Sequence, residues 1–179
     1  MEPDGHPPRV TTVTADVGEV AALYERACAP LMGLLASIGG SASDAEEIAH
    51  DAFVQLLANW EHVREYEDPQ AWLRTVAVRL LISRHRRRQV SKRGLQRLVA
   101  RSPSTTPEPG PNRVAVEAAL ATLHVSHRAV LILHHALDMP VEKVAEVLQI
   151  PSGTVKSRLS RARHALAPLL RDEELTNHD

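Results

Sequence analysis

The segment from Val141 to Leu170 constrains the fold of this chain more than any other, because it predicts two helices joined by a tight turn. The first helix is indicated by apolar residues at the i, i+3, i+4, i+7 spacing of one helix face, namely Val141, Val144, Ala145 and Leu148. Pro151 disfavours helical backbone at Ile150, and Ser152 is then placed to cap a second helix. The pattern is typical of a helix-turn-helix unit.

The second of these helices has an apolar side and a basic side. The apolar side carries Val155, Leu159, Ala162, Leu166 and Leu169, and the other side carries Thr154, Lys156, Ser157, Arg158, Arg161 and Arg163. No acidic residue occurs between Gly153 and Leu170, so nothing within this helix repels a polyanion. Such a helix fits the major groove of duplex DNA, where its first turns reach base edges. The alternative is an ordinary helical hairpin with a solvated basic face.

Three blocks of the sequence together resemble one protein family. The run IPSGTVKSRLSRARHAL closely resembles the helix-turn-helix of bacterial sigma factors, in particular the small extracytoplasmic-function group. The blocks SDAEEIAHDAFVQLLANW and DPQAWLRTVAVRLLISRHRRR resemble the promoter-opening domain of the same family, and the resemblance covers most of Val17 to Leu170. It implies a sigma factor that binds core RNA polymerase, recognises two promoter elements and directs transcription initiation, without catalytic residues, cofactor or metal of its own.

The resemblance also implies which residues contact DNA. The family reads the upstream promoter element as duplex, about 35 base pairs before the start; this implies contacts from Ser152, Thr154, Lys156, Ser157, Arg158 and Arg161. The family holds the melted strand of the downstream element, about 10 base pairs before the start, on a basic and aromatic surface. The corresponding residues here are Tyr66, Trp72, Arg74, Arg79, Arg84, Arg86, Arg87 and Arg88. Trp60 and Trp72 can equally be core residues, because both lie at helical spacing.

A further set of residues is implied for polymerase docking. In the family, the helix that matches Ser43 to Trp60 docks on the largest polymerase subunit. The non-apolar side of this helix carries Asp44, Glu47, Asp51, Gln55 and Asn59. Acidic residues dominate 42–68, whereas 79–101 holds basic residues and no acid, so one surface suits a basic protein and another a polyanion. A merely solvated acidic face remains the alternative from charge alone.

Composition indicates an all-helical chain, its length allows one ordinary domain or two small ones, and the resemblance implies two, joined by a flexible linker. Aromatic residues are only 3% of the 179 residues, which suits small helical bundles better than aromatic-rich sheet cores. The expected division is a disordered tail at 1–15, a promoter-melting and polymerase-binding domain at 16–88, a Pro-rich linker at 89–112, a helix-turn-helix domain at 113–170 and an acidic tail at 171–179. Cys28 is the only cysteine, and no transmembrane run or signal peptide is evident, so we expect a cytoplasmic protein.

Local signals predict where the helices begin and end. Helix starts are expected at Asp16, at a capping box from Ser43 to Glu46, at Asp68-Pro69 and at Ser126. The pair Gly39-Gly40 should end the first helix, and Pro30 should kink or divide it. In the helix after Pro69 we expect Trp72, Leu73, Val76, Leu80 and either Ile82 or Ser83 on the inner side. Gln149 stands where the family often has Gly, at a cost of up to ~1 kcal/mol if the turn needs a positive φ.

Two rival functions and one regulatory partner remain open from sequence. A stand-alone DNA-binding regulator would use the same helix-turn-helix but would not need the blocks between Ser43 and Arg88. A zinc enzyme is suggested only by the spacing of His124, His127, His134 and His135, without an accompanying HExxH motif or carboxylate cluster. Since many members of the resembled family are held inactive by an anti-sigma protein, such a partner is a further expectation.

Overall fold

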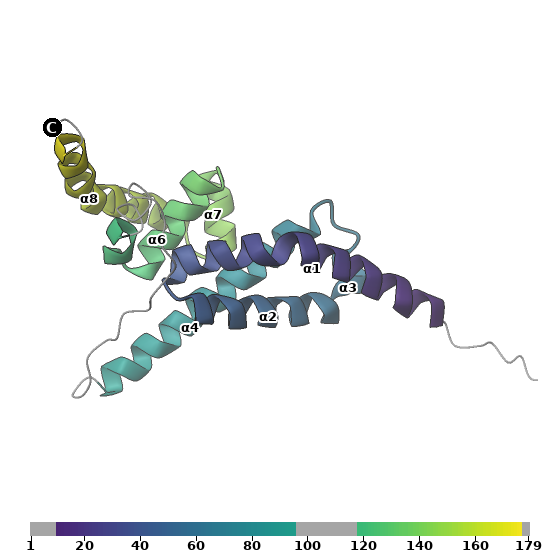
Figure 1. The fold of residues 1–179 in the computed structure, drawn as a ribbon. Helices are drawn as coiled ribbons and strands as arrows, with labels where there is room; N and C mark the ends of the chain where they lie inside the picture. Colours follow the sequence, from purple (N-terminus) through teal and green to yellow (C-terminus); the bar gives the residue numbers. More distant parts are fainter. Residues whose placement is uncertain (1–9, 96–117, 177–179) are drawn as a thin grey trace, which may run out of the picture.

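The computed structural model describes residues 10–95 and 118–176, which contain helices and no strand. The helices are α1 (Val10–Gly39), α2 (Ala42–Ala58), α3 (Trp60–Val63), α4 (Pro69–Leu95), α6 (Val125–Leu131), the π-helical turn η1 (Ile132–Ala136), α7 (Val141–Leu148) and α8 (Ser152–Thr176), with a further helical turn at 118–122. The expected all-helical fold is confirmed (Figure 1).

The first half of the chain is a bundle of α1, α2 and α4. Its centre is formed by large apolar side chains that are almost completely buried: Leu23, Leu35, Ile38, Ile48, Leu56, Leu73 and Leu81. Burial of each such side chain stabilises the fold by roughly 1.5–3 kcal/mol. The resulting bundle holds the outer faces of α2 and α4 in fixed positions.

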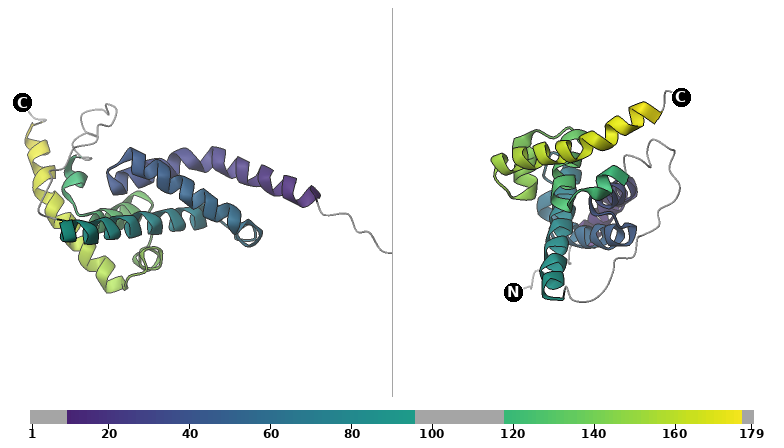
Figure 2. Two further views of the ribbon diagram at one scale, coloured as in Figure 1. Left: turned by 90° about the horizontal axis from the view of Figure 1, so that it is seen from below. Right: turned by 90° about the vertical axis from the view of Figure 1, so that its left-hand side faces the viewer.

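The second half consists of α6, α7 and α8, and it packs directly against the first half. α4 contacts α1 and α2 on one side and α6 and α7 on the other, while α8 crosses near α4 (Figure 2). One continuous apolar core therefore includes Leu81 of α4 as well as Val144 and Val147 of α7. A separate small cluster joins Ala119 and Leu123 to α8.

Packing on two sides changes which residues of α4 are buried. Leu73 is buried as expected, but the other fully buried positions are Ala77, Val78 and Leu81. Trp72, Val76 and Leu80, expected on the inner side, are half-buried and pack at the edge of the core. The single apolar stripe predicted for this helix is therefore wrong, because α4 lies between two helical layers.

Several helix ends follow the sequence signals. α1 ends at Gly39, and Gly40 follows with a φ of +75°, a backbone conformation that glycine adopts without strain. Asp68 caps α4, since its Oδ1 accepts a hydrogen bond from the Ala71 N–H at 2.9 Å. α1 is continuous through Pro30, so this proline does not divide the helix; the buried Ala27 and Leu31 hold the segment on both sides.

Other helices begin one or more residues before the expected position. α1 begins at Val10, so Asp16 lies inside it. Ser41, and not Ser43, caps α2: its hydroxyl accepts from the Asp44 N–H at 3.2 Å. His124, and not Ser126, caps α6, because its Nδ1 accepts from the Ser126 N–H at 3.2 Å. In each case two polar residues lie two positions apart, Ser41 and Ser43 or His124 and Ser126. The earlier residue of each pair has the extended backbone that an N-cap requires.

Further differences concern the segments expected to be a linker and tails. α4 continues to Leu95, so the first residues of the expected linker are helical. α8 begins at Ser152, which is the first helical residue and not the cap before it, and the Pro151 carbonyl accepts from the N–H groups of Thr154 and Val155. α8 continues to Thr176, so part of the expected acidic tail is helical. Residues 1–9, 96–117 and 177–179, which include most of the expected linker, lie outside the described residues.

The turn between α7 and α8 contains the positive φ that the sequence suggested. Gln149 adopts φ 53° and ψ 48°, the left-handed conformation that favours glycine. We expect Gln149→Gly to raise the free energy of unfolding by up to about 1 kcal/mol, measured by urea denaturation. Gln149→Ala, which keeps the strained conformation, should give no such gain. A glycine variant less stable than the parent would contradict this explanation of the turn.

Candidate nucleic-acid interface

The helix-turn-helix places one side of α8 in its core and the other side at the surface. Val155, Leu159, Ala162 and Leu166 are buried, as the periodicity predicts. Of the six candidate DNA contacts on this helix, Ser152, Lys156, Ser157 and Arg161 are exposed, whereas Thr154 and Arg158 are half-buried. The Ser157 hydroxyl donates to the Thr154 carbonyl at 3.0 Å, so Ser157 is partly engaged with its own helix. The first turns of α8 therefore present a basic, acid-free surface.

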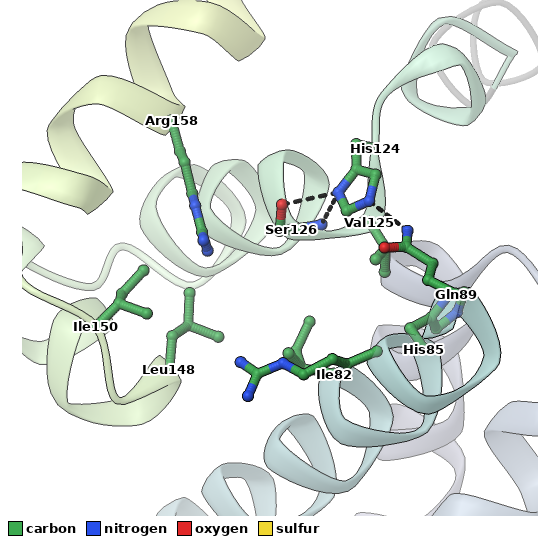
Figure 3. A pocket seen from close by; sticks show the side chains of 10 residues that line it. Ile82, His85, Gln89, His124, Val125, Ser126, Leu148, Ile150 and Arg158 are labelled. Carbon is green, nitrogen blue, oxygen red and sulfur yellow. Dashed lines mark hydrogen bonds between the residues drawn. The ribbon is translucent and has the colours of Figure 1, made fainter. Parts of the chain in front are cut away.

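Arg158 has an environment that the sequence did not indicate. It lines a pocket of about 140 Å³ between the two halves of the chain, together with Ile82 and Arg86 of α4 and Ser126 of α6 (Figure 3). Burial lowers the pKa of the Arg158 guanidinium, and the positive charge of Arg86 lowers this pKa further. Arg158 has no hydrogen bond or ion pair to any residue in 10–95 or 118–176. It is thus a cation without a described counter-charge.

The candidate arginines of α4 divide into engaged and unengaged residues. Arg74 pairs with Asp68 at 3.4 Å, and Arg79 donates to carbonyls of α7. Arg84 and Arg88 bond to acidic residues of α2. Arg86 and Arg87 are exposed and have no ion pair with a described residue. Arg86 and Arg87 are therefore the α4 guanidinium groups most available to a nucleic acid in this arrangement.

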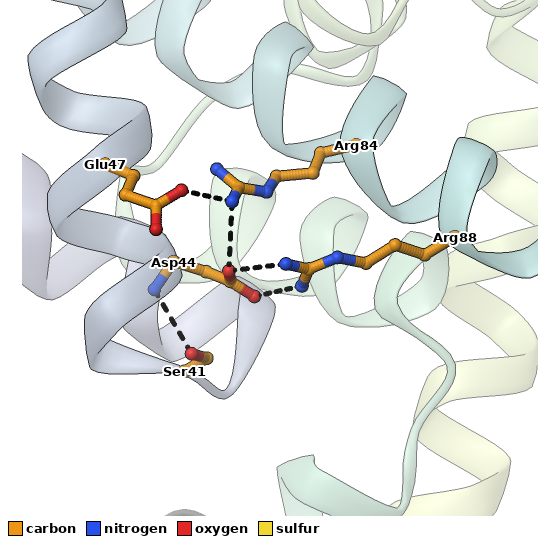
Figure 4. A network of polar contacts seen from close by, with 5 residues as sticks. All are labelled: Ser41, Asp44, Glu47, Arg84 and Arg88. Atoms are coloured by element: carbon orange, nitrogen blue, oxygen red, sulfur yellow. Dashed lines mark hydrogen bonds and ion pairs between the residues drawn. The ribbon is translucent and has the colours of Figure 1, made fainter.

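A network of acids and arginines joins α2 to α4 (Figure 4). Arg88 binds both carboxylate oxygens of Asp44, with 2.8 Å between Nη2 and Oδ1. Arg84 bonds to Glu47 and lies 3.6 Å from Asp44. Asp44 is only 15% exposed. Two of the five residues expected to dock polymerase are thus already paired with two of those expected to contact DNA.

The Asp44 network predicts a pH-dependent contribution to stability. The hydrogen bonds from Arg88 hold the pKa of the Asp44 carboxyl below its ordinary 3.8. Because this pKa falls on folding, the stabilisation is complete above the ordinary value and is lost as pH drops through the lower folded-state value. Asp44→Asn should therefore cost about 1 kcal/mol at pH 7, measured by urea denaturation, and much less in strong acid.

The matched control for Asp44→Asn is Glu46→Gln, at an exposed carboxylate of the same helix. It should leave the free energy of unfolding unchanged at both pH values. An equal loss of stability in both variants would mean that overall charge, and not the pairing of Asp44 with Arg88, sets the effect.

The outer face of α2 carries two apolar side chains that sequence reasoning missed. Val54 is 60% exposed and Leu57 is 54% exposed. Leu57 is adjacent in sequence to the buried Leu56, and its apolar type would favour burial, but no described helix covers this side of α2. The two residues lie beside the exposed candidates Asp51 and Gln55. Helical spacing alone places Val54 opposite the buried Ile48, Ala52 and Leu56, whereas Leu57 lies at the margin of the buried face next to Phe53, where spacing does not decide exposure.

The aromatic candidates are placed differently from one another. Tyr66 is 41% exposed in the turn after α3 and packs edge-on against His62, with 5.2 Å between ring centroids. Trp60 is buried in the core, and its Nε1 has no hydrogen-bond partner. Trp72 is half-buried at the edge of the core. Of these three rings, that of Tyr66 is the most open to an unstacked base.

The histidines considered for zinc take part in other contacts. His124 caps α6, and the His134 Nδ1 lies 2.7 Å from the Met139 carbonyl oxygen. His135 lies 3.2 Å from the Arg163 guanidinium. Within the described residues no three His, Cys, Asp or Glu side chains form a group that could hold a metal ion. None of the helices described is both long and apolar enough to cross a membrane.

The fold and these surfaces define a helix-turn-helix protein with a second basic helix, α4, in the bundle that packs against it. The chain matches the family descriptions "Sigma-70 region 2" over residues 23–90 and "Sigma-70, region 4" over residues 113–166. The ECF RNA polymerase sigma factor SigL of Mycobacterium tuberculosis (strain ATCC 25618 / H37Rv) is 30% identical over 174 residues, covering 90% of this chain and 94% of SigL. The chain belongs to the family of extracytoplasmic-function (ECF) RNA polymerase sigma factors.

One further relative agrees with this assignment, and one solved structure agrees with the fold. The ECF RNA polymerase sigma factor SigW of Bacillus subtilis (strain 168) is 28% identical over 147 residues, covering 74% of this chain and 79% of SigW. The sigma factor RpoE of Bartonella quintana, solved in complex with the anti-sigma factor NepR, superposes with a TM-score of 0.69 at 23% identity, covering 86% of this chain and 97% of RpoE. The likeness to RpoE supports the fold. As a sigma factor, the chain acts in transcription initiation with core RNA polymerase and promoter DNA.

Proposed function

We propose that the three surfaces of this sigma factor divide the work of promoter recognition among them. α8 reads the upstream element as duplex through Ser152, Thr154, Lys156, Ser157, Arg158 and Arg161. α4 and the turn after α3 hold the melted strand of the downstream element through Tyr66, Trp72, Arg74, Arg79, Arg84, Arg86, Arg87 and Arg88. The α2 face docks core polymerase through Asp44, Glu47, Asp51, Gln55 and Asn59, joined by Val54 and Leu57.

The observation that carries the docking assignment is the apolar exposure on α2. Val54 and Leu57 are more than half exposed next to Asp51, on a helix whose opposite side is fully buried. Apolar side chains ringed by polar ones are typical of a surface that another protein covers. A regulator that binds only DNA would not need an exposed apolar surface for a protein partner. RNA synthesis belongs to the core enzyme, so we assign no catalytic residue to this chain and place it in the cytoplasm with polymerase.

The first test is co-elution of the purified chain with core RNA polymerase on a sizing column, at moderate salt and without DNA. We expect a stable complex. Failure to co-elute, with a chain shown to be folded, would favour the stand-alone regulator. An anti-sigma protein is a further proposed partner, because the related RpoE of Bartonella quintana was captured with NepR.

A further inference from the structure

The pocket in Figure 3 holds two arginines whose charges no described acid neutralises. It lies between α4, α6, α7 and α8 and has a volume of about 140 Å³. Arg86 of α4 and Arg158 of α8 both line it, and none of the described residues around it is acidic. Burial lowers the pKa of the Arg158 guanidinium, and the charge of Arg86 lowers it further. The two cations therefore repel each other in a pocket whose described walls carry no anionic group.

The acidic residues that α2 presents to α4 are paired with other arginines. Asp44 binds Arg88 through both carboxylate oxygens, and Glu47 bonds to Arg84. Neither acid lines the pocket. The acids of α2 thus leave the positive charge of the pocket uncompensated.

The neutral polar groups at the edge of the pocket are bonded to one another. The His124 Nδ1 accepts a hydrogen bond from the Ser126 N–H at 3.2 Å and lies 2.8 Å from the Ser126 hydroxyl oxygen. The other ring nitrogen of His124 bonds to Gln89 of α4. Arg86 and Arg158 are therefore the charged donors that the described wall of this pocket offers to a ligand.

The rest of the wall is largely apolar, and the space is small. Val125 is buried, and Ile82, Leu148 and Ile150 are half-buried around it. An apolar protein cavity of about 150 Å³ is large enough for a benzene molecule. A pocket of similar volume therefore admits a phosphate group with a short carbon chain, and it is too small for a whole nucleotide.

The charge of the pocket favours a phosphate group over a carboxylate. A carboxylate carries one negative charge and would neutralise one of the two arginines, whereas a phosphate monoester carries close to two charges at pH 7. The planar fork of arginine binds phosphate through paired hydrogen bonds. Guanidinium groups from two different helices can take separate oxygens of one phosphate.

We propose that the pocket between α4 and α8 binds the phosphate group of a small phosphorylated compound. Arg86 and Arg158 hold the phosphate, and the carbon chain of the compound lies against Leu148 and Ile150. The site is a property of the free chain, so its test needs neither polymerase nor DNA.

The test is a titration of the full chain with inorganic phosphate and with ethyl phosphate, followed by NMR signals of ¹⁵N-labelled arginine side chains. Sodium chloride keeps the ionic strength fixed. The signals of Arg86 and Arg158 should shift in a saturable way, with one site per chain. Arg86→Ala and Arg158→Ala should each weaken the affinity for phosphate at least about tenfold, as loss of a charged hydrogen bond does.

Arg163→Ala is the matched control, because Arg163 is an exposed arginine of α8 that does not line the pocket. It removes the same charge and should keep the affinity for phosphate within about threefold. Shifts that do not saturate, or equal losses in Arg86→Ala and Arg163→Ala, would overturn the proposal. Arg86 is exposed, so Arg86→Ala tests the site even where Arg158→Ala fails to fold.

The two probes separate the sources of the phosphate group. Tighter binding of ethyl phosphate than of inorganic phosphate would support a phosphorylated metabolite whose carbon chain contacts the apolar wall. Equal affinities would assign the site to inorganic phosphate and overturn the part given to Leu148 and Ile150. Binding of neither probe would overturn the site altogether.

Arg158 is also assigned to the upstream promoter element, so phosphate in the pocket should compete with duplex DNA for this side chain; this consequence alone rests on the proposed function. Saturating phosphate should weaken binding of a mixed-sequence duplex to the parent chain about threefold at fixed ionic strength. Arg86→Ala, which keeps Arg158 but lacks the second cation of the pocket, should show a smaller effect. Phosphate binding without such competition would contradict the role of Arg158 in DNA binding and not the phosphate site.

Discussion

Replacing Arg158 by Ala should weaken binding of the sigma factor, in complex with core polymerase, to the upstream promoter element by about 10- to 100-fold. This is the range for loss of one good arginine contact to a base, about 1–3 kcal/mol. The measurement is a titration of the complex with labelled promoter duplex at fixed salt. The affinity for core polymerase should not change, because Arg158 lies on α8, away from the outer face of α2.

The control for Arg158→Ala is Arg163→Ala on the same helix. Arg163 is exposed and its guanidinium lies 3.2 Å from His135, so it is not a candidate base contact. It should change DNA affinity less than threefold, as loss of a single surface charge does. Equal losses of DNA affinity in the two variants would mean that α8 binds DNA only by non-specific electrostatic attraction, and not through a base contact of Arg158.

Reversing the charge of Asp51 should have the opposite outcome. Asp51→Arg places a cation beside Val54 on the exposed side of α2, where we propose that a basic surface of polymerase docks. Like charges across an interface cost several kcal/mol, so the affinity for core polymerase should fall at least about 100-fold. Binding of the isolated chain to duplex DNA should not weaken. Fluorescence titration of labelled sigma factor with core polymerase measures the first quantity.

Glu25→Arg is the matched control for Asp51→Arg, since Glu25 is an exposed acid on α1. It makes the same change in net charge and should keep polymerase affinity within about threefold. If both reversals weakened docking equally, the α2 face would have no special role, and long-range charge alone would account for the effect.

The sequence predicts those features of the fold that depend on residues close together in the chain, and fails for those that depend on contacts between distant segments. The helix-turn-helix follows from local signals, namely periodicity and Pro151, whereas Gln149 was singled out by the resemblance, since the family often has Gly there. The inner stripe of α4 does not, because its burial depends on α7, which is distant in sequence. Caps were misplaced where two polar residues compete within a few positions, as at Ser41 and Ser43.

In the candidate site, contacts between residues distant in sequence were even harder to predict. Sequence reasoning placed Asp44 and Arg88 on different functional surfaces, yet they bond to each other across 44 positions of sequence. Residue types and spacing do not reveal such a pairing. The exposure of Leu57 beside the buried Leu56 likewise depends on which helices pack on α2. The residues for each surface could be proposed from the sequence, whereas their mutual engagement required the three-dimensional arrangement.

The most direct test of promoter recognition by this chain is to map the transcription starts that core RNA polymerase produces on fragmented genomic DNA, with and without the chain. We expect transcripts that depend on the chain, with starts that share a sequence element about 35 base pairs upstream. Arg158→Ala should reduce these transcripts. An identical pattern of starts with and without the chain would contradict the assignment of promoter recognition to this protein.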